Sequence, residues 1–130
     1  MAVQEFITGI QHVGIPTADL DQTMAFYQSL GFERAGLFHN GENRCAFMRL
    51  GNLTIETWEG DPTNPTAGAI NHISLNTTDV DKAFAAAKQQ GLHLVNTEIQ
   101  SIPSFWDKGI RFFNILGPNH ETIEFCEILN

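Results

Sequence analysis

The chain has 130 residues, 42% of them hydrophobic, which is enough to bury the core of a globular unit. Its 15 acidic and 7 basic residues give a formal net charge of −8, which disfavours nucleic acid and anionic membranes as partners because both require clustered cations. No apolar stretch approaches the roughly 20 residues of a membrane helix, and the N-terminus lacks signal-peptide features. We therefore expect a cytoplasmic protein with a small-molecule substrate, and buried, unpaired thiols at Cys45 and Cys126.

A repeat with an offset of 60 residues organises the chain. The segment "HVGIPTADLDQTMAFYQSLGF", which starts at His12, aligns without a gap with "HISLNTTDVDKAFAAAKQQGL", which starts at His72. Both copies contain the pattern Thr-x-Asp-apolar-Asp at the same distance from the histidine. A half-length duplication is the simplest explanation of this match.

Each copy is expected to begin with a short strand and a helix. The apolar runs "GIQHVGI" and "AINHISL" are typical of strands. Asp19 and Asp79 are suited to the N-cap of the helix that follows. Both helices have apolar residues every three to four positions and are expected to end at Gly31 and Gly91, which suit the left-handed position after a helix.

Three strand-like segments follow each helix. In the first copy they are about 32–38, "CAFMRL" and "LTIETW"; in the second they are "LHLVNTE", "IRFFNIL" and "ETIEFCEI". Each copy is therefore predicted as β-α-β-β-β, and the fold class as α+β, with two βαβββ modules forming a curled mixed sheet. We expect a single domain over 1–130, with the first module at 8–60 and the second at 68–130.

The second module is enlarged in its middle hairpin, where "SIPSFWDKG" lies. An aromatic loop on only one copy would serve either as a lid over a substrate or as an interface. Phe105 and Trp106 are candidates for contact with an apolar ligand. Lys108 and Arg111 flank the loop and are the candidates for binding an anionic group.

The last strand of each module carries a glutamate in a shared motif, as Glu56 in "TIETWE" and Glu124 in "TIEFCE". A carboxylate among apolar strand neighbours is costly unless it is paired or metal-bound. The first strand of each module offers one imidazole, His12 or His72. Two His and two Glu at equivalent positions suit one divalent ion such as Zn, Ni, Co, Mn or Fe.

The alternative for each residue alone is structural. A single strand histidine is more often a core or edge residue than a ligand, and a single strand glutamate usually faces solvent. Four such residues in a repeated pair favour the metal site. The second glutamates of the two motifs, Glu59 and Glu127, are expected on the opposite face as solvated charges.

The segments "HVGIPTADLDQTMAFYQSLGF", "NLTIETW", "INHISLNTTDVDKAF" and "FFNILGPNHETIEF" together resemble the vicinal oxygen chelate superfamily. Its members include glyoxalase I, methylmalonyl-CoA epimerase, fosfomycin-resistance enzymes, extradiol dioxygenases and bleomycin-binding proteins. The resemblance covers roughly residues 9–128. It implies paired βαβββ modules around a metal, often in a homodimer whose sites form between modules of different chains.

Within this superfamily, His12, Glu56, His72 and Glu124 resemble the ligand set of glyoxalase I. Dioxygenases and fosfomycin-resistance enzymes use two His and one Glu, the epimerase typically has Gln at the first Glu, and the bleomycin binders lack the ligands. Bacterial glyoxalase I enzymes carry an Arg four residues after the first His, where this chain has Pro16. The thiol of a substrate therefore need not be glutathione.

The resemblance implies a metal-dependent isomerase or lyase of glyoxalase I type that acts on an α-oxo thiol adduct. The ion would stabilise the enediolate formed when a C–H proton leaves, and Glu124 or Glu56 would move that proton. One alternative is an acyl-CoA epimerase or an epoxide-opening resistance enzyme of the same superfamily. Another is a drug- or metabolite-binding protein without catalysis, in which the aromatic loop closes a pocket.

Overall fold

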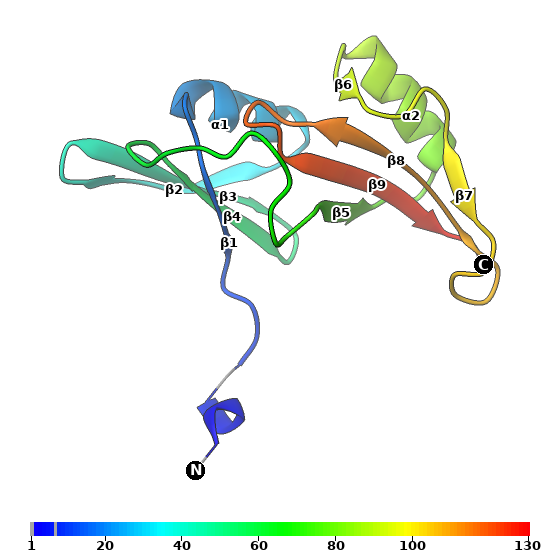
Figure 1. The fold of residues 1–130 in the computed structure, drawn as a ribbon, viewed down its shortest axis with the longest axis horizontal. Coiled ribbons are helices and arrows are strands. Elements are labelled where there is room, and N and C mark those ends of the chain that lie inside the picture. The colour runs from blue at the N-terminus through cyan, green and yellow to red at the C-terminus, as the bar shows by residue number, and fades with distance from the viewer. Residues whose placement is uncertain (1, 7) are drawn as a thin grey trace. The chain divides into compact units, whose positions relative to one another are not determined.

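The computed structural model describes residues 2–6 and 8–130, which form two compact units, one ending at Thr63 and the other starting at Asn64 (Figure 1). The first unit contains a 3₁₀ helix and five further elements, in chain order: Val3–Phe6, β1 (Val13–Pro16), α1 (Leu20–Ser29), β2 (Glu33–Asn40), β3 (Asn43–Leu50) and β4 (Leu53–Trp58). The second unit contains β5 (Ile73–Asn76), α2 (Val80–Gln89), β6 (His93–Leu94), β7 (Gln100–Ile102), β8 (Ile110–Leu116) and β9 (Thr122–Ile128). Neither α1 nor α2 has the length and apolar character of a membrane-spanning helix.

The strands of each unit form a mixed sheet with the unit's helix packed against it (Figure 1). In the first unit the strand order is β1-β4-β3-β2, with β1 parallel to β4 and the other pairs antiparallel. In the second unit the order is β5-β9-β8-β6, with β5 parallel to β9. The predicted α+β class is confirmed, and the first unit has the predicted β-α-β-β-β order, while the second unit has four strands after its helix instead of three. The parallel pairing places the first and last strands of each module side by side.

Both helices begin and end as the repeat predicts. The side chains of Asp19 and Asp79 accept a hydrogen bond from the backbone N–H three residues further on, at 3.0 and 3.1 Å. Gly31 and Gly91 follow the helices with φ values of +97° and +72°, a region that strongly favours glycine. In both copies the N–H of this glycine and that of the next residue bond back to carbonyls of the last helical turn.

Most buried side chains lie on the helix-facing side of each sheet, whereas Ile110 and Cys126 lie on the other face of the second sheet, together with Glu124. Strand alternation buries Ile55 and Thr57 of β4 completely and turns Glu56 to the opposite face. The buried apolar residues of the first unit are Leu20, Met24, Tyr27, Phe32, Ala46, Met48 and Ile55; those of the second are Val80, Ala87, Ile110, Phe113, Ile115, Ile123 and Cys126.

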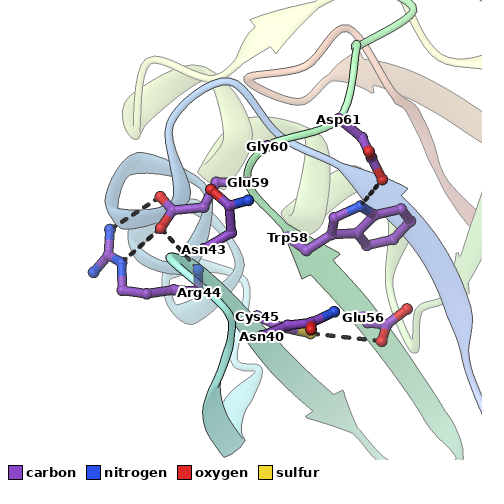
Figure 2. Close-up of a pocket in the computed structure, with 9 residues that line it drawn as sticks. All are labelled: Asn40, Asn43, Arg44, Cys45, Glu56, Trp58, Glu59, Gly60 and Asp61. Atoms are coloured by element: carbon purple, nitrogen blue, oxygen red, sulfur yellow. Dashed lines mark hydrogen bonds and ion pairs between the residues drawn. The ribbon is translucent and has the colours of Figure 1, made fainter.

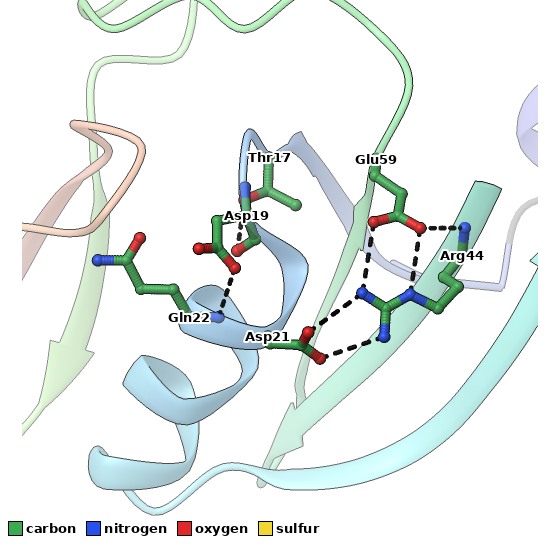
Figure 3. Close-up of polar contacts among 6 residues, drawn as sticks. All are labelled: Thr17, Asp19, Asp21, Gln22, Arg44 and Glu59. Carbon is green, nitrogen blue, oxygen red and sulfur yellow. Dashed lines mark hydrogen bonds and ion pairs between the residues drawn. The ribbon is translucent and has the colours of Figure 1, made fainter.

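An ion-pair cluster ties the start of α1 to its sheet (Figure 3). The guanidinium of Arg44, on β3, donates to both carboxylate oxygens of Asp21 at 3.1 and 3.3 Å. It also donates to Glu59 at 3.1 Å, and the backbone N–H of Arg44 donates to the same carboxylate at 2.9 Å. The prediction that Glu59 is a solvated charge is therefore wrong, because its partner comes from the neighbouring strand.

The second unit has the equivalent arginine and two carboxylates, but only one of the carboxylates is hydrogen-bonded to the arginine. Arg111, on β8, makes a two-pronged bond to Asp81 at 2.7 and 2.9 Å. Glu127 accepts a hydrogen bond from the backbone N–H of Val80, the first residue of α2, at 2.9 Å. Glu127 is thus not a solvated charge either, because it satisfies an N–H that has no partner within the helix.

Glu59→Gln is expected to lower the free energy of unfolding more at pH 7 than at pH 3. Hydrogen bonds from Arg44 lower the pKa of the Glu59 carboxyl in the folded state. The resulting stabilisation is fully present above the unfolded pKa of about 4.3 and is lost as the pH falls through the lower folded pKa. Urea unfolding at the two pH values measures this difference. The exposed Glu42→Gln variant is the control, and an equal loss from Glu59→Gln at both pH values would contradict the prediction.

The strand predicted over "LHLVNTE" is mostly wrong. The structure forms only β6 there and a separate strand β7 further on, and both pair with β8. Between them the side-chain oxygen of Asn96 accepts the backbone N–H of Asn114 at 2.7 Å and its side-chain amide at 3.2 Å. A side chain therefore replaces the backbone acceptor that a continuous strand would supply, and the intervening residues leave the ladder.

Candidate metal centre

The first unit brings one imidazole and one carboxylate together. His12 lies directly before β1, and Glu56 lies on β4, the parallel neighbour of β1. His12 Nε2 and Glu56 Oε1 are 3.5 Å apart. The residue paired with Glu56 across the two strands is Gly14, so no side chain from β1 stands over the carboxylate.

The second unit repeats the pair, with a different residue opposite the carboxylate. His72 Nε2 and Glu124 Oε2 are 3.8 Å apart. Ser74 takes the place of the glycine and is paired with Glu124 between β5 and β9. Its hydroxyl donates to Glu124 Oε1 at 2.6 Å and lies 3.2 Å from the sulfur of Cys126.

Both imidazoles are oriented by the residue that precedes them. The Nδ1 atom of His12 is hydrogen-bonded to the side-chain oxygen of Gln11, and that of His72 to the side-chain oxygen of Asn71 at 2.9 Å. An amide oxygen only accepts hydrogen bonds, so Nδ1 carries the proton in both rings. In the neutral ring Nε2 then presents its lone pair. In both units that lone pair faces a carboxylate.

This donor set fits a divalent metal ion. A neutral imidazole nitrogen and a carboxylate are both acceptors, so they face each other favourably when a metal ion lies between them, or when a proton on Nε2 makes the contact a direct ion pair. Two ligands about 2.1 Å from one ion lie about 3.4 Å apart at a tetrahedral angle. The observed separations of 3.5 and 3.8 Å are closer to that value than to a direct N–H···O bond of about 2.9 Å. Within the described residues 2–6 and 8–130, no group of three or more His, Cys, Asp or Glu could hold an ion, so one unit supplies at most half of the proposed set.

The sequence analysis missed Gln11 and Asn71. Each immediately precedes its histidine, and the two are separated by the same 60 residues as the rest of the repeat. An amide side chain in both copies at this position was the available signal. Ser74 was missed because its partner Glu124 is 50 residues away in the sequence and becomes a neighbour only through strand register.

The two carboxylates differ in how firmly they are held. Glu124 accepts the short bond from Ser74, and its side chain is 15% exposed. Glu56 is 27% exposed and accepts a bond of 3.5 Å from the thiol of Cys45 (Figure 2). Burial and, to a smaller extent, the neighbouring Glu56 together raise the pKa of Cys45 to about 11. Cys45 is therefore a thiol that donates to Glu56, which leaves Glu56 the less restrained carboxylate.

A cavity of about 300 Å³ opens beside Glu56 (Figure 2). Its walls include side chains from β2, β3, β4 and the segment after β4: Asn40, Asn43, Arg44, Cys45, Trp58, Glu59 and Asp61. The indole N–H of Trp58 donates to Asp61 at 2.6 Å. The sequence analysis named none of these cavity residues as candidates for binding, because their side chains meet only when β2, β3 and β4 pair.

The residues proposed for substrate contact in the second unit lie on an exposed loop and its flank. Phe105 and Trp106 are 50% and 69% exposed, and Trp106 has a φ of +57°, which is strained for a bulky residue. Trp106 and Lys108 line a cavity of about 490 Å³ together with 128–130. Arg111 lies on β8, where its guanidinium is held by Asp81.

The fold and the paired sites define the class of protein. The sequence model of the Glyoxalase/Bleomycin resistance protein/Dioxygenase superfamily matches residues 11–112, and the chain belongs to this superfamily. The uncharacterized protein YwbC of Bacillus subtilis (strain 168) is 31% identical over 125 residues, which cover 91% of this chain and 96% of that protein.

Solved structures share the fold. A glyoxalase family protein from Enterococcus faecalis superposes with a TM-score of 0.76 at 22% identity, covering 94% of this chain and 99% of that one. The fosfomycin resistance protein FosX from Listeria monocytogenes, in complex with Mn(II) and sulfate, gives a TM-score of 0.73 at 19% identity, covering 95% and 94%. The predicted superfamily is confirmed, while the closer likeness to glyoxalase I stays a prediction.

Proposed function

We propose that the chain is a divalent-metal-dependent isomerase or lyase of glyoxalase I type that acts on an α-oxo thiol adduct. The observation that supports this proposal is the repeated pair in which the Nε2 atom of an imidazole lies 3.5 or 3.8 Å from a carboxylate, with Nδ1 bonded to the preceding amide side chain. In the proposal His12, Glu56, His72 and Glu124 hold one ion of Zn, Ni, Co, Mn or Fe. The proposal includes a homodimer.

The two carboxylates have separate roles in this proposal. A bound ion supplies a Lewis acid for two neighbouring oxygens of the substrate. Glu56 takes a proton from one substrate carbon and returns it to the next. Glu124 stays in place because the Ser74 hydroxyl holds it, whereas Glu56 has only the longer thiol bond and a glycine opposite. Phe105, Trp106, Lys108 and Arg111 remain proposed contacts to the substrate.

A second candidate is an epoxide-opening resistance enzyme. The fold similarity to FosX from Listeria monocytogenes, whose structure contains Mn(II), favours it. Its substrate would be an epoxide attacked by water or a thiol instead of a thiol adduct that isomerises. Assays of both reactions with the same metal-loaded protein separate the two candidates.

The native protein, purified without chelators or affinity nickel, is expected to hold about one divalent ion per chain, and His72→Ala is expected to lose it. Removing one of four ligands leaves an incomplete site. Metal content by elemental analysis measures this, followed by titration with each candidate ion. A native protein that takes up no metal would contradict the proposed function.

Asn71 offers a matched pair of variants for the same measurement. Asn71→Ala removes the acceptor that fixes Nδ1 of His72, and such losses typically weaken metal binding by about 10- to 100-fold. Asn71→Asp retains an acceptor oxygen and is expected to bind metal nearly as well as the native protein. Equal binding by both variants would show that the amide does not position the ligand.

A further inference from the structure

The cavity beside Glu56 is placed to receive one end of a bound molecule. Glu56 and Trp58 are two residues apart on β4 and therefore share a face of the strand, and both line the cavity (Figure 2). Its volume of about 300 Å³ is at the lower end of small-molecule sites. A cavity of this volume accommodates a group of about the size of one substituted ring.

One wall of the cavity is a fixed aromatic surface. The Trp58 indole is held at its N–H by Asp61 at 2.6 Å. The ring lies so close to β1 that a Cβ at Gly14 would be 3.1 Å from it. Gly14 therefore has two effects, since it leaves Glu56 uncovered and lets the indole lie against the strand. A flat apolar group would stack on such a surface.

The charges around the cavity disfavour an anion. Three carboxylates line it, those of Glu56, Glu59 and Asp61. Among the described lining residues the one cation is Arg44, and its guanidinium is already bonded to Asp21 and Glu59. A ligand with a carboxylate or phosphate at this end would face Asp61 without a cation of its own.

We propose that this cavity binds the non-reacting end of the substrate, and that this end is small, apolar on one side, and either uncharged or cationic. The inference rests on the proposed function, because it takes the reacting end to lie at Glu56. The amide groups of Asn40 and Asn43 at the rim supply donors and acceptors for a polar tip. A peptide thiol with carboxylates, an acyl-CoA and a phosphonate are all disfavoured at this position.

Three thiols of similar size that carry a positive, a neutral or a negative group test the inference. Benzyl thiols with an aminomethyl, a hydroxymethyl or a carboxylate group in the para position are converted to adducts with methylglyoxal. Binding to the metal-loaded protein is followed by tryptophan emission, and the same titration with the Trp58→Phe variant identifies the part of the change that comes from Trp58, one of the two tryptophans in the chain. The cationic and neutral adducts are expected to bind at least about tenfold more tightly than the anionic one.

Asp61→Asn is the matched variant, because an asparagine oxygen still accepts the Trp58 N–H while the charge is gone. In this variant the discrimination against the anionic adduct is expected to shrink. If the protein with Asp61 intact bound the anionic adduct as tightly as the other two adducts, or more tightly, the inference would be overturned. It would also be overturned if the protein took up metal and turned over substrate without any change in the emission of Trp58. If the protein takes up no metal, the proposed function is contradicted instead. The order of the three adduct affinities, measured with the metal-free protein, then still tests which charge the cavity accepts.

Discussion

Glu56→Gln is expected to lower the turnover of the metal-loaded protein by about 10² or more while the substrate still binds. A glutamine keeps an oxygen toward the site but has no basic carboxylate to accept a proton. Glu56 is the proposed base because its carboxylate is less restrained than that of Glu124. Gly14 lies opposite Glu56, whereas Ser74 lies opposite Glu124 and donates a hydrogen bond to it. Turnover is measured at saturating metal, and substrate binding by the emission of Trp58.

Glu124→Gln and two changes at Ser74 are the comparisons. Glu124→Gln is expected to weaken metal binding first and to retain more turnover than Glu56→Gln once metal is saturating. Ser74→Ala frees Glu124 and is expected to act in the same direction, whereas Ser74→Thr keeps the hydroxyl. A reversed ranking, with turnover lost from Glu124→Gln and kept in Glu56→Gln, would make Glu124 the base.

Phe113→Ala is expected to lower the free energy of unfolding by about 3–5 kcal/mol. The Phe113 side chain is fully buried, stacks on Phe125 with ring centroids 5.0 Å apart, and meets the edge of Phe84 at 5.0 Å. Its removal leaves a cavity between β8 and α2. Urea unfolding followed by circular dichroism measures the loss.

Phe38→Ala is the control for this substitution, because Phe38 is 57% exposed on β2 and its loss is expected to cost about 0.5 kcal/mol or less. A small effect of Phe113→Ala, comparable to that of Phe38→Ala, would contradict the packing described for the second unit. The two phenylalanines differ in burial and not in chemistry, so the comparison isolates the contribution of packing.

Local chemistry explains which parts of the fold the sequence predicted well. The N-caps at Asp19 and Asp79 and the left-handed glycines at Gly31 and Gly91 depend on residues within one helical turn. Strand alternation likewise sufficed to turn Glu56 away from the core. Each of these features is decided by neighbours in the sequence, and the repeat showed each of them twice.

Contacts that depend on register could not be predicted in the same way. Glu59 finds Arg44 only because β3 pairs with β4, and Ser74 finds Glu124 only because β5 lies beside β9. The interruption between β6 and β7 depends on the Asn96 side chain reaching the backbone of Asn114. Periodicity states which face a residue occupies, but the partner on that face is set by the alignment of the strands.

The hydrogen bonds that Gln11 and Asn71 accept from the two imidazoles have a consequence for how the proposed metal site would be assembled. Each imidazole ring is oriented by the side chain of the residue that precedes it in the chain, so its direction depends on a local contact. Each unit thus carries one imidazole that already lies beside a carboxylate, at 3.5 Å in the first unit and 3.8 Å in the second. In the proposed metal site, duplication of one such unit would supply both pairs of ligands, and the difference between Gly14 and Ser74 at equivalent positions makes the two carboxylates unequal while the pairing of the strands stays the same.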